Sequence, residues 1–289
     1  MKLSIITINY NNADGLERTL NSVLEQSCEG IEHIIVDGES TDGSVDVIKR
    51  YVLKVESRKS KVDSVIWVSE KDDGIYNAMN KGIKRATGEY IQILNSGDIL
   101  ASDDVTAKMV AVLESFSRES IVNSRENRVD ILYGNMIKKD YGTGKVIGKS
   151  GETEYSLRQY YSSTMNHDCC YIRRDLFEKY GLYDEKLKIV SDWKWFLQTI
   201  GLGNVKPVYV DIDVTIFDAS GISESNLEMR SKERRQVLEE ILPPAILADY
   251  DKYAFPMEQY NRLKKYHLWP IVYFMERVLF KLNKWKILR

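Results

Sequence analysis

The chain has 289 residues, of which 43% are hydrophobic, 10% aromatic and 29% charged, the composition of a soluble globular protein with a sizeable core. Its 41 basic and 43 acidic residues leave a net charge of −2, which argues against a dedicated nucleic-acid binder. The three cysteines form neither a disulfide framework nor a Cys-x-x-Cys metal site, so we expect a reducing, cytoplasmic setting.

The first hundred residues alternate apolar strand segments with amphipathic helices. The patterns predict strands at residues 3–9, 31–36, 62–68 and 90–94, and helices at 13–25, 44–53 and 75–86. The first strand is apolar and β-branched on both faces, as in a strand buried within a parallel sheet. Repeated strand–helix units of this kind predict an α/β fold with a mostly parallel sheet and helices on both faces.

The rest of the chain is less regular. It predicts a helix at 104–117, a polar loop at 115–128, a hairpin of strands 130–138 and 144–149, short helices at 174–180 and 192–201, and one or two strands within 206–217. A charged helix at 226–241 should end before Pro243 and Pro244. We expect one α/β domain over residues 1–225, with halves at 1–100 and 101–225, and a helical C-terminal extension over 226–289.

Polar residues follow each of the four early strands. Ligands of open α/β sheets bind beyond the carboxyl ends of the strands, so these segments are expected to line one polar crevice. The four segments are residues 9–12, 37–43, 70–74 and 95–98. Each of them alone could form a turn or a helix cap, and Asp42 is equally well explained as the N-cap of the next helix.

The glycine pattern narrows the class of ligand. No G-x-G-x-x-G follows the first strand, as an NAD enzyme would require, and Gly148-Lys149-Ser150 matches only the end of a P-loop. Without a phosphate-cradling loop, a pyrophosphate needs another counter-charge, such as a divalent cation held by few carboxylates. Asp98, at a buried strand end, is the natural ligand.

Four of these segments resemble the family-2 glycosyltransferases. They are residues 3–11 (LSIITINYN), 36–43 (VDGESTDG), 70–82 (EKDDGIYNAMNKG) and 86–90 (ATGEY), and the resemblance extends to about residue 223. It implies an inverting enzyme of the GT-A fold that uses a nucleotide sugar and Mg²⁺ or Mn²⁺. Residues 1–100 would then bind the nucleotide sugar, and residues 101–225 the acceptor.

The resemblance assigns roles to particular donor-side residues. Asp37 is similar to the aspartate that binds the nucleotide base, Asp72 to one that completes the nucleoside pocket, and Asp98 to the last aspartate of the D-x-D motif, which meets the metal. Asn95 and Gly97 stand where acids can occur, so only Asp98 is predicted as a metal ligand. The predicted donor-binding residues are Thr7, Asn9, Tyr10, Asn11, Asp37, Ser40, Asp72, Asn80, Asn95, Ser96 and Gly97.

The acceptor half supplies the candidate base. Ser191-Asp192 resembles the helix start in which the family's catalytic base lies. Inversion requires a carboxylate to take the proton of the attacking hydroxyl, and Asp192 is our choice. The alternative is that Asp192 is the N-cap of the following helix, and both roles can hold at once.

Further acceptor-side segments follow the same resemblance. His167-Asp168 is similar to the family's His-Gln pair, with Asp168 a departure, although a lone histidine is more often structural. Phe217 with residues 221–223 resembles a Phe-x-x-x-Gly-Ile-Ser segment beneath the acceptor site. The acceptor-side candidates are therefore His167, Ser191 and Trp193.

These features predict a glycosyltransferase. It would move a sugar from a nucleoside-diphosphate donor, most simply a UDP-sugar, to a saccharide or lipid-linked acceptor in bacterial cell-surface polysaccharide or lipopolysaccharide synthesis. One alternative is a sugar-nucleotide pyrophosphorylase, which would want a glycine-rich basic loop where this chain has residues 9–12. Another is a non-catalytic nucleotide-binding scaffold, which the presence of Asp37, Asp98 and Asp192 disfavours.

The C-terminal tail is basic and aromatic. Residues 257–289 hold eight Lys or Arg against two Glu, which leaves residues 1–256 with 33 basic and 41 acidic residues, a net charge of −8. Apolar residues at positions 271, 274, 275, 278, 282 and 285 share one helical face, a pattern typical of interfacial membrane binding. The alternative is packing on the chain's own domain or on a partner subunit. With no export signal and no bilayer-spanning stretch, we expect a cytoplasmic protein, at most peripheral on the membrane.

Overall fold

The computed structural model describes the chain except for residues 58–59, 120–127, 153–155, 219–225 and 288–289. The chain divides into two compact units, residues 1–234 and 235–289, which are described separately. This division lies inside helix α9 (Leu227–Ile241). The domain boundary expected between residues 225 and 226 stays a prediction.

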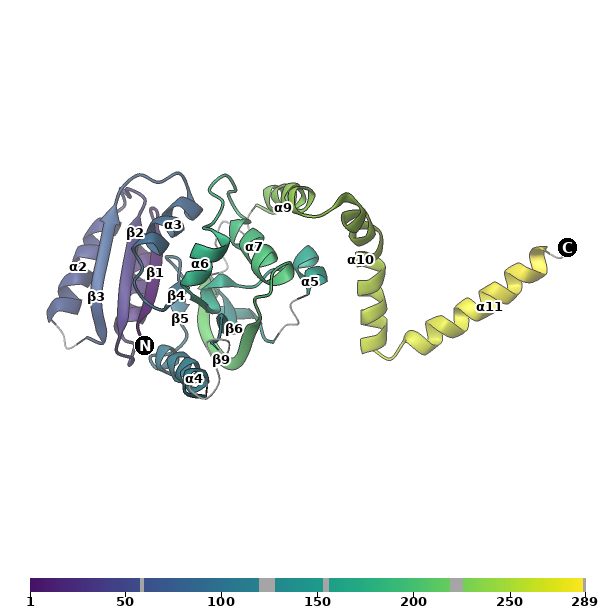
Figure 1. The fold of residues 1–289 in the computed structure, drawn as a ribbon, viewed down its shortest axis with the longest axis horizontal. Coiled ribbons are helices and arrows are strands. Elements are labelled where there is room, and N and C mark those ends of the chain that lie inside the picture. Colours follow the sequence, from purple (N-terminus) through teal and green to yellow (C-terminus); the bar gives the residue numbers. More distant parts are fainter. Residues whose placement is uncertain (58–59, 120–127, 153–155, 219–225, 288–289) are drawn as a thin grey trace. The chain divides into compact units, whose positions relative to one another are not determined.

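In its described residues, the first unit is built on one nine-stranded sheet (Figure 1). The hydrogen-bonded order is β3-β2-β1-β4-β8-β6-β9-β5, with β7 paired to β6. The strands are β1 (Leu3–Asn9), β2 (Ile31–Asp37), β3 (Val62–Ser69), β4 (Tyr90–Ile93), β5 (Ile99–Leu100), β6 (Ile131–Asp140), β7 (Lys145–Lys149), β8 (Cys170–Arg173) and β9 (Pro207–Asp218). The first four in chain order run parallel, whereas β8 is antiparallel to β4 and β6.

Helices cover both faces of this sheet, as predicted. Successive side chains of a strand point to opposite faces of the sheet. His33 of β2 is paired with Ile5 of β1, so the next residue, Ile6, points to the face opposite His33. His33 bonds Tyr51 of α2 on one face, and Ile6 meets Gly82 of α3 on the other, where an added Cβ would lie 2.4 Å from Ile6 Cγ2. The helices of this unit are α1 (Ala13–Leu24), α2 (Ser44–Ser57), α3 (Ile75–Arg85), α4 (Val105–Glu119), α5 (Leu157–Ser162), α6 (Asp175–Tyr180) and α7 (Ser191–Phe196).

The later elements refine the sequence predictions. Helix α4 continues to Glu119, so residues 115–119 are helical rather than part of a loop, and residues 120–127 of that loop lie outside the described residues. The predicted hairpin is confirmed as β6 and β7. A single strand, β9, replaces the one or two expected, and it pairs with β6 through shifts in register. The last predicted short helix becomes α7 followed by a π-helical turn, η4 (Leu197–Gly201).

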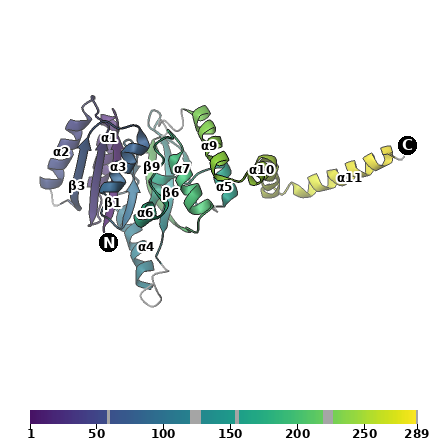
Figure 2. The same cartoon turned by 45° about the horizontal axis from the view of Figure 1, so that its top comes forward.

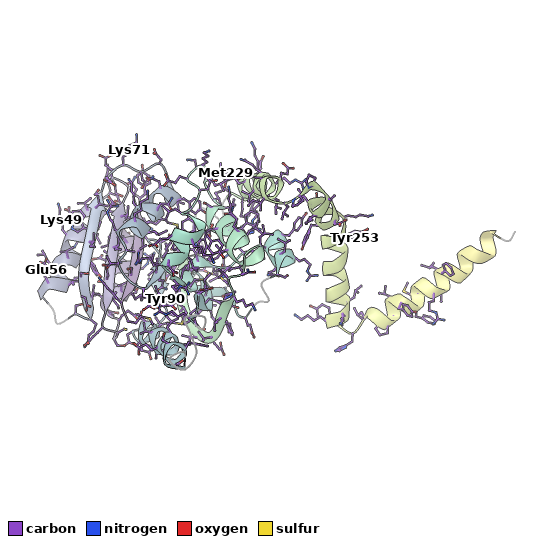
Figure 3. The ribbon with its side chains drawn as sticks, in the orientation of Figure 1. Lys49, Glu56, Lys71, Tyr90, Met229 and Tyr253 are labelled. Carbon is purple, nitrogen blue, oxygen red and sulfur yellow. The ribbon has the colours of Figure 1, made fainter. Side chains whose placement is uncertain are left out.

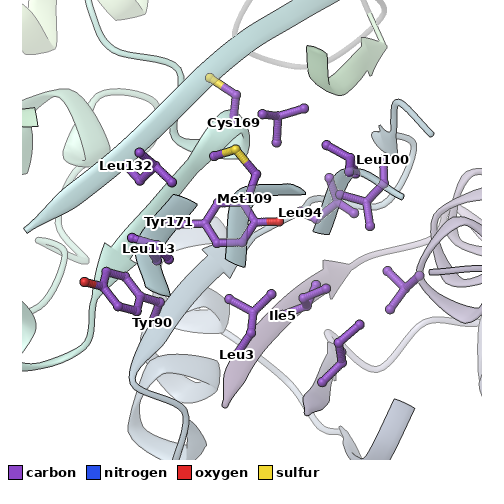
Figure 4. Close-up of a cluster of buried hydrophobic side chains, with 14 of the residues drawn as sticks. Leu3, Ile5, Tyr90, Leu94, Leu100, Met109, Leu113, Leu132, Cys169 and Tyr171 are labelled. Carbon is purple, nitrogen blue, oxygen red and sulfur yellow. The ribbon is translucent and has the colours of Figure 1, made fainter. Parts of the chain in front are cut away.

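The main core joins the parallel and antiparallel parts of the sheet. Met109 and Leu113 of α4 pack with Leu94, Leu132 and Tyr171 (Figure 4). All five side chains are at most 1% exposed. Burying a side chain of this size is worth about 1.5–3 kcal/mol, so this cluster fixes the short strand β8 beside β4. The packing of β4 and β8 therefore also restrains the segments next to them, the loop of residues 95–98 after β4 and His167–Cys169 before β8.

The second unit contains the end of α9 and two further helices, α10 (Pro244–Lys265) and α11 (Trp269–Ile287), seen in two orientations in Figures 1 and 2. The break expected at Pro243 and Pro244 is confirmed. Tyr253 of α10 is 52% exposed (Figure 3). On α11, large apolar side chains at least 40% exposed are Ile271, Tyr273, Phe274, Met275, Val278, Leu279 and Phe280. Among the described residues, we find no helix with the length and apolar character that crossing a membrane requires.

One buried carboxylate ties the N-terminal ends of the sheet together. Glu32 of β2 is 2% exposed and accepts hydrogen bonds from Ser4 Oγ at 2.7 Å, Thr87 N at 2.8 Å, Thr87 Oγ1 at 2.7 Å and Lys2 Nζ at 2.9 Å. Burial raises the pKa of Glu32, but these donors outweigh it and lower the pKa to about 2.

Glu32 should make the free energy of unfolding depend on pH in the acidic range. Replacing Glu32 by Gln should lower the free energy of unfolding by about 1–3 kcal/mol at pH 7, because buried donors lose a charged acceptor. Since the folded pKa is below the unfolded one, the wild-type advantage is full above about pH 4.5 and fades as the pH falls toward 2. Urea titrations followed by tryptophan fluorescence measure it, with exposed Glu17→Gln as control. An equal difference at pH 7 and pH 2.5 would contradict this assignment.

Candidate active site

The ends of β1, β2 and β3 meet around Asp37. Asn9 pairs with Asp37 in the sheet register, and its Nδ2 donates to Asp37 Oδ1 at 2.7 Å. Ser40 donates through its backbone N at 3.0 Å and through Oγ at 2.6 Å, and Ser69 Oγ donates at 2.6 Å. Asp37 is fully buried. Its carboxylate therefore holds three strand ends together, and contact with a nucleotide base would displace one of these donors.

Beside Asp37, two side chains approach each other over a glycine. A Cβ at Gly38 would lie 2.5 Å from Asp72 Oδ2 and 3.2 Å from Tyr10 Cδ2, so only glycine permits this approach. Tyr10 is 67% exposed. Asn11 has φ +48° and is held there by its N–H bond to Ser40 Oγ at 2.8 Å. The structure thus brings together Asn9, Tyr10, Asn11, Asp37, Ser40 and Asp72, as the sequence predicted.

The loop of residues 95–98 is fastened to helix α1. Thr19 Oγ1 accepts from Gly97 N at 3.0 Å and donates to Asp98 O at 2.7 Å. Asn12, the N-cap of α1, donates from Nδ2 to Ser96 O at 3.0 Å. Gly97 has φ +110°, which favours glycine. Asn12 belongs to the polar segment 9–12 that the sequence pointed to, whereas Thr19 was not predicted because it looks like an ordinary residue of the helix.

Asp98 is a buried carboxylate with two other aspartates near it. It is 3% exposed, and its Oδ1 accepts from Asp218 N at 3.0 Å. Burial and the charge of Asp168, with a smaller effect of Asp218, raise the pKa of Asp98 well above its ordinary value. Asp168 is itself 3% exposed and accepts from Thr215 Oγ1 at 2.6 Å.

This carboxylate chemistry fits a hard divalent cation. Carboxylate oxygens are its preferred ligands, and a cation would relieve the repulsion that raises the pKa of Asp98. Within the part of the chain that the structure describes, no three His, Cys, Asp or Glu side chains are grouped to hold a metal by themselves. A cation at Asp98 would therefore complete its shell with other oxygens, such as those of phosphate.

Asp192 has a different environment. Helix α7 begins at Ser191 with Val190 as its N-cap residue, so Asp192 lies inside the first turn. Its Oδ1 accepts from Tyr76 OH at 2.8 Å, and His167 Nδ1 lies 3.0 Å from its Oδ2. Burial raises the pKa of Asp192, but the bonds and charge of His167 and the Tyr76 hydroxyl bring it below the ordinary value. Asp192 is thus ionised at neutral pH, as a general base must be.

His167 connects this carboxylate to the 95–98 loop. Burial lowers the pKa of His167, but the bond and charge of Asp192 and the charges of Asp168 and Asp98 raise it to about 9. Its Nε2 lies 3.3 Å from Asn95 Nδ2. An imidazolium donates from both ring nitrogens, so the Nε2 of a charged His167 needs an acceptor. Turning the Asn95 amide by 180° would supply one, because it would bring Oδ1 to Nε2. That Oδ1 is buried and has no partner among the described residues.

Four further predicted site residues, Thr7, Asn80, Ser191 and Trp193, are at most 2% exposed, and their roles at the site stay predictions. Thr7 Oγ1 is 3.0 Å from Nε2 of buried His33, inside the sheet. Asn80 bonds the backbone N and O of Tyr183 at 3.0 and 2.9 Å. Trp193 Nε1 donates to Tyr160 O at 2.7 Å, and the buried Ser191 hydroxyl has no partner among the described residues. Phe217 lies in β9, and residues 221–223 lie outside the described residues.

Comparison with known proteins identifies the family. The model of glycosyl transferase family 2 matches residues 4–181. The chain belongs to this family. An uncharacterized glycosyltransferase of Mycobacterium tuberculosis is 31% identical over 226 residues, 76% of each chain. A PGL/p-HBAD biosynthesis glycosyltransferase of Mycobacterium bovis is 25% identical over 218 residues, 75% of this chain and 77% of that one. The protein is therefore a glycosyltransferase.

Solved structures show the same fold. Staphylococcus aureus TarS 1–349 in complex with UDP-GlcNAc aligns with a TM-score of 0.61 and 19% identity, over 82% of this chain and 64% of that one. The mannosyltransferase PcManGT of Pyrobaculum calidifontis, in complex with GDP-Man and Mn²⁺, gives 0.59 and 18%, over 83% and 63%. A longer TarS structure is matched over 41% of its chain. The predicted GT-A fold is confirmed.

The Thr19 hydroxyl should control the order of the 95–98 loop. Replacing Thr19 by Val keeps the shape but leaves Gly97 N–H and Asp98 O without this partner, which should cost about 1–3 kcal/mol. Hydrogen-exchange mass spectrometry should show faster exchange around residues 95–98. Thr199→Val is the matched control, because among the described residues the hydroxyl of buried Thr199 donates within its own helical segment, to Trp195 O and Phe196 O. Equal exchange in the two variants would argue against the anchor.

Proposed function

We propose that this enzyme transfers a sugar from a nucleoside-diphosphate donor to a hydroxyl of a saccharide or lipid-linked acceptor with inversion. The observation that carries the proposal is Asp192, an ionised carboxylate with both oxygens held by hydrogen bonds and linked through His167 to the 95–98 loop. A UDP-sugar is the simplest donor, since the related fold of TarS binds UDP-GlcNAc. The relative from Mycobacterium bovis is named for PGL/p-HBAD biosynthesis, and for this chain we propose a biosynthetic role in cell-surface polysaccharide or lipopolysaccharide synthesis.

Asp192 acts as the general base in this proposal. Its carboxylate accepts the proton of the acceptor hydroxyl while that oxygen attacks the anomeric carbon, and the bond from that carbon to the diphosphate oxygen breaks on the opposite side. The carboxylate is ionised at neutral pH because its pKa lies below the ordinary value, and its side chain is 15% exposed. It is ionised before the acceptor arrives, and it is reachable.

The donor-side residues divide into two groups. Tyr10, Asp72 and the Asp37 cluster stand where the nucleoside would bind, with the exposed Tyr10 ring available for stacking on a base. Asp98 would hold Mg²⁺ or Mn²⁺. When bound, such a cation neutralises charge on the leaving diphosphate. The chain's own contribution is to fix Asp98 through Thr19 and the Asp218 backbone.

Two rival functions make different demands. A sugar-nucleotide pyrophosphorylase would want a glycine-rich basic loop after β1, and the segment there is Asn9-Tyr10-Asn11-Asn12. A non-catalytic scaffold would bind nucleotide without releasing it from a nucleotide sugar. Thermal-shift measurements with UDP, GDP and dTDP, each with and without Mn²⁺, identify the nucleotide. UDP release from a panel of UDP-sugars then separates an enzyme from a scaffold.

Replacing Asp192 by Asn should abolish turnover while nucleotide binding persists. The amide cannot accept the proton, and loss of general-base catalysis typically costs 10²–10⁴-fold in kcat. UDP binding, measured by isothermal titration calorimetry, should change by less than about twofold, because Asp192 makes no contribution to ground-state donor binding. Turnover within tenfold of wild type would refute the assignment of the base.

We also propose that α11 attaches the protein peripherally to the cytoplasmic membrane. Its exposed apolar side chains suit the acyl boundary, and Lys264, Lys265 and Arg277 are exposed as well. The basic excess of residues 257–289 complements anionic headgroups. This location would bring the enzyme to a lipid-linked acceptor.

Reversing three tail charges should detach the protein. The full chain with Lys281, Lys284 and Lys286 changed to Glu should bind phosphatidylglycerol vesicles at least tenfold more weakly, since each basic residue contributes about 1 kcal/mol. Lys49→Glu with Lys54→Glu, on α2, is the control. Flotation measures binding, and light scattering in parallel reports oligomers. Unchanged flotation would exclude the membrane surface, and a dimer that the variant disrupts would assign α11 to contact between copies.

A further inference from the structure

The two oxygens of Asp192 are held from two separate parts of the domain. Tyr76, which donates to Oδ1 at 2.8 Å, stands in the first turn of α3, directly after the Asp72–Gly74 turn on the donor side. His167, at 3.0 Å from Oδ2, stands in the 3-10 helix η3 (His167–Cys169) before β8. The backbone N–H of Trp193 also stabilises the ionised form of Asp192. A carboxylate has about four lone-pair sites, so these three donors leave one site for a substrate proton.

Tyr76 has little freedom to leave this position. Its side chain is 5% exposed, and its ring centroid lies 5.7 Å from that of Tyr183. Tyr183 in turn contacts Phe177 of α6 and Trp195 of α7, at 5.7 and 6.2 Å. Burial and the charge of Asp192 raise the pKa of Tyr76 well above its ordinary value, so its hydroxyl keeps its proton and donates.

His167 is placed equally firmly. Its ring lies between Asp192 and Asn95, the first residue of the 95–98 loop. Nδ1 carries a proton in the imidazolium and in one neutral tautomer, and either form can donate to Asp192. The bond to Asp192 therefore depends on geometry and not on a change of charge.

We propose that Tyr76 and His167 are positioning residues that fix the rotation of the Asp192 carboxylate, and so set where the acceptor hydroxyl must stand to be deprotonated. The proposal rests on the proposed role of Asp192 as the base. Rotation of the carboxylate by a fraction of a turn would move the accepting lone pair away from the attacking oxygen. Tyr76 follows the Asp72–Gly74 turn, and His167 adjoins the 95–98 loop. The positions of these two donor-side segments therefore affect the orientation of the Asp192 carboxylate.

Tyr76→Phe removes one donor and leaves the ring cluster in place. Turnover, measured as UDP release from the UDP-sugar that the wild type uses best in the panel, should fall roughly tenfold to a hundredfold, the effect expected from one lost hydrogen bond to a charged group. KM for the nucleotide sugar and UDP affinity should change by less than about twofold. Tyr183→Phe is the matched control, because that buried hydroxyl has no partner among the described residues although its ring touches Tyr76. It should keep wild-type kcat.

Substitutions at His167 test which ring nitrogen matters. Asn at position 167 places an amide N–H near the position of Nδ1, whereas Gln places one near Nε2. If the bond to Asp192 is what counts, H167N should retain several-fold more kcat than H167Q or H167A. Thermal melting of each variant reports folding separately. Equal losses in all three variants would overturn the positioning role.

A measurement without substrate tests the bond itself. In ¹⁵N-histidine NMR of the full chain, the signal assigned to His167 by its absence in H167N should show a protected Nδ1 proton. That proton should exchange faster in D192A and remain protected in Y183F. A His167 Nδ1 that carries no protected proton in the wild type would overturn the proposal, whatever the kinetics.

The kinetic outcomes separate this proposal from the proposed function. If D192N releases UDP at more than a tenth of the wild-type rate, the base assignment is wrong and the positioning proposal falls with it. If D192N is inactive while Y76F and H167A match Y183F, the base stands and only the positioning proposal is wrong. Both proposals are supported if three results are found together. D192N is inactive, Y76F has a lower kcat at unchanged KM, and H167N keeps several-fold more kcat than H167Q or H167A.

Discussion

A buried negative charge needs donors, and at Asp192 those donors come from elements far apart in the sequence. Tyr76 lies 116 residues before Asp192 and His167 lies 25 residues before it. An unpaired carboxylate at this depth would be neutralised or expelled. For both bonds to form, α3, η3 and α7 must pack in one arrangement, which the aromatic contacts of Tyr76, Tyr183 and Trp195 secure. The polar centre of the domain thus depends on its aromatic surroundings.

Two aspartates of the site are pushed in opposite directions by their neighbours. Asp98, beside Asp168 and Asp218, has its pKa raised, whereas Asp192, beside His167 and Tyr76, has its pKa lowered. Opposed shifts of this kind suit two carboxylates to different roles. Under the proposed function, Asp98 would hold a cation and Asp192 would accept a proton. The charges of both aspartates raise the pKa of His167. The electrostatics of donor and acceptor sides are therefore one coupled system.

The sequence was most informative where local pattern decides structure. The apolar run at residues 3–9 and the polar segments after each early strand predicted the parallel half of the sheet and the grouping of Asn9, Asp37 and Asp72. It was least informative where tertiary contact decides. Tyr76 and Thr19 have helical patterns typical of core residues, and nothing local shows that they reach residues 192 and 97. Thr7 and Trp193 illustrate the reverse, since both stand beside site residues in sequence but point into the fold.

The central claim is that Asp192 removes a proton from an oxygen that attacks opposite the leaving diphosphate. The most direct measurement is the anomeric configuration of the first-formed product, followed by ¹H NMR during turnover of an α-linked UDP-sugar that the enzyme accepts. A single displacement assisted by one base gives the β-anomer, and that is the predicted result. An α-anomer as first product would contradict the account, because retention does not proceed through one attack from the side of Asp192.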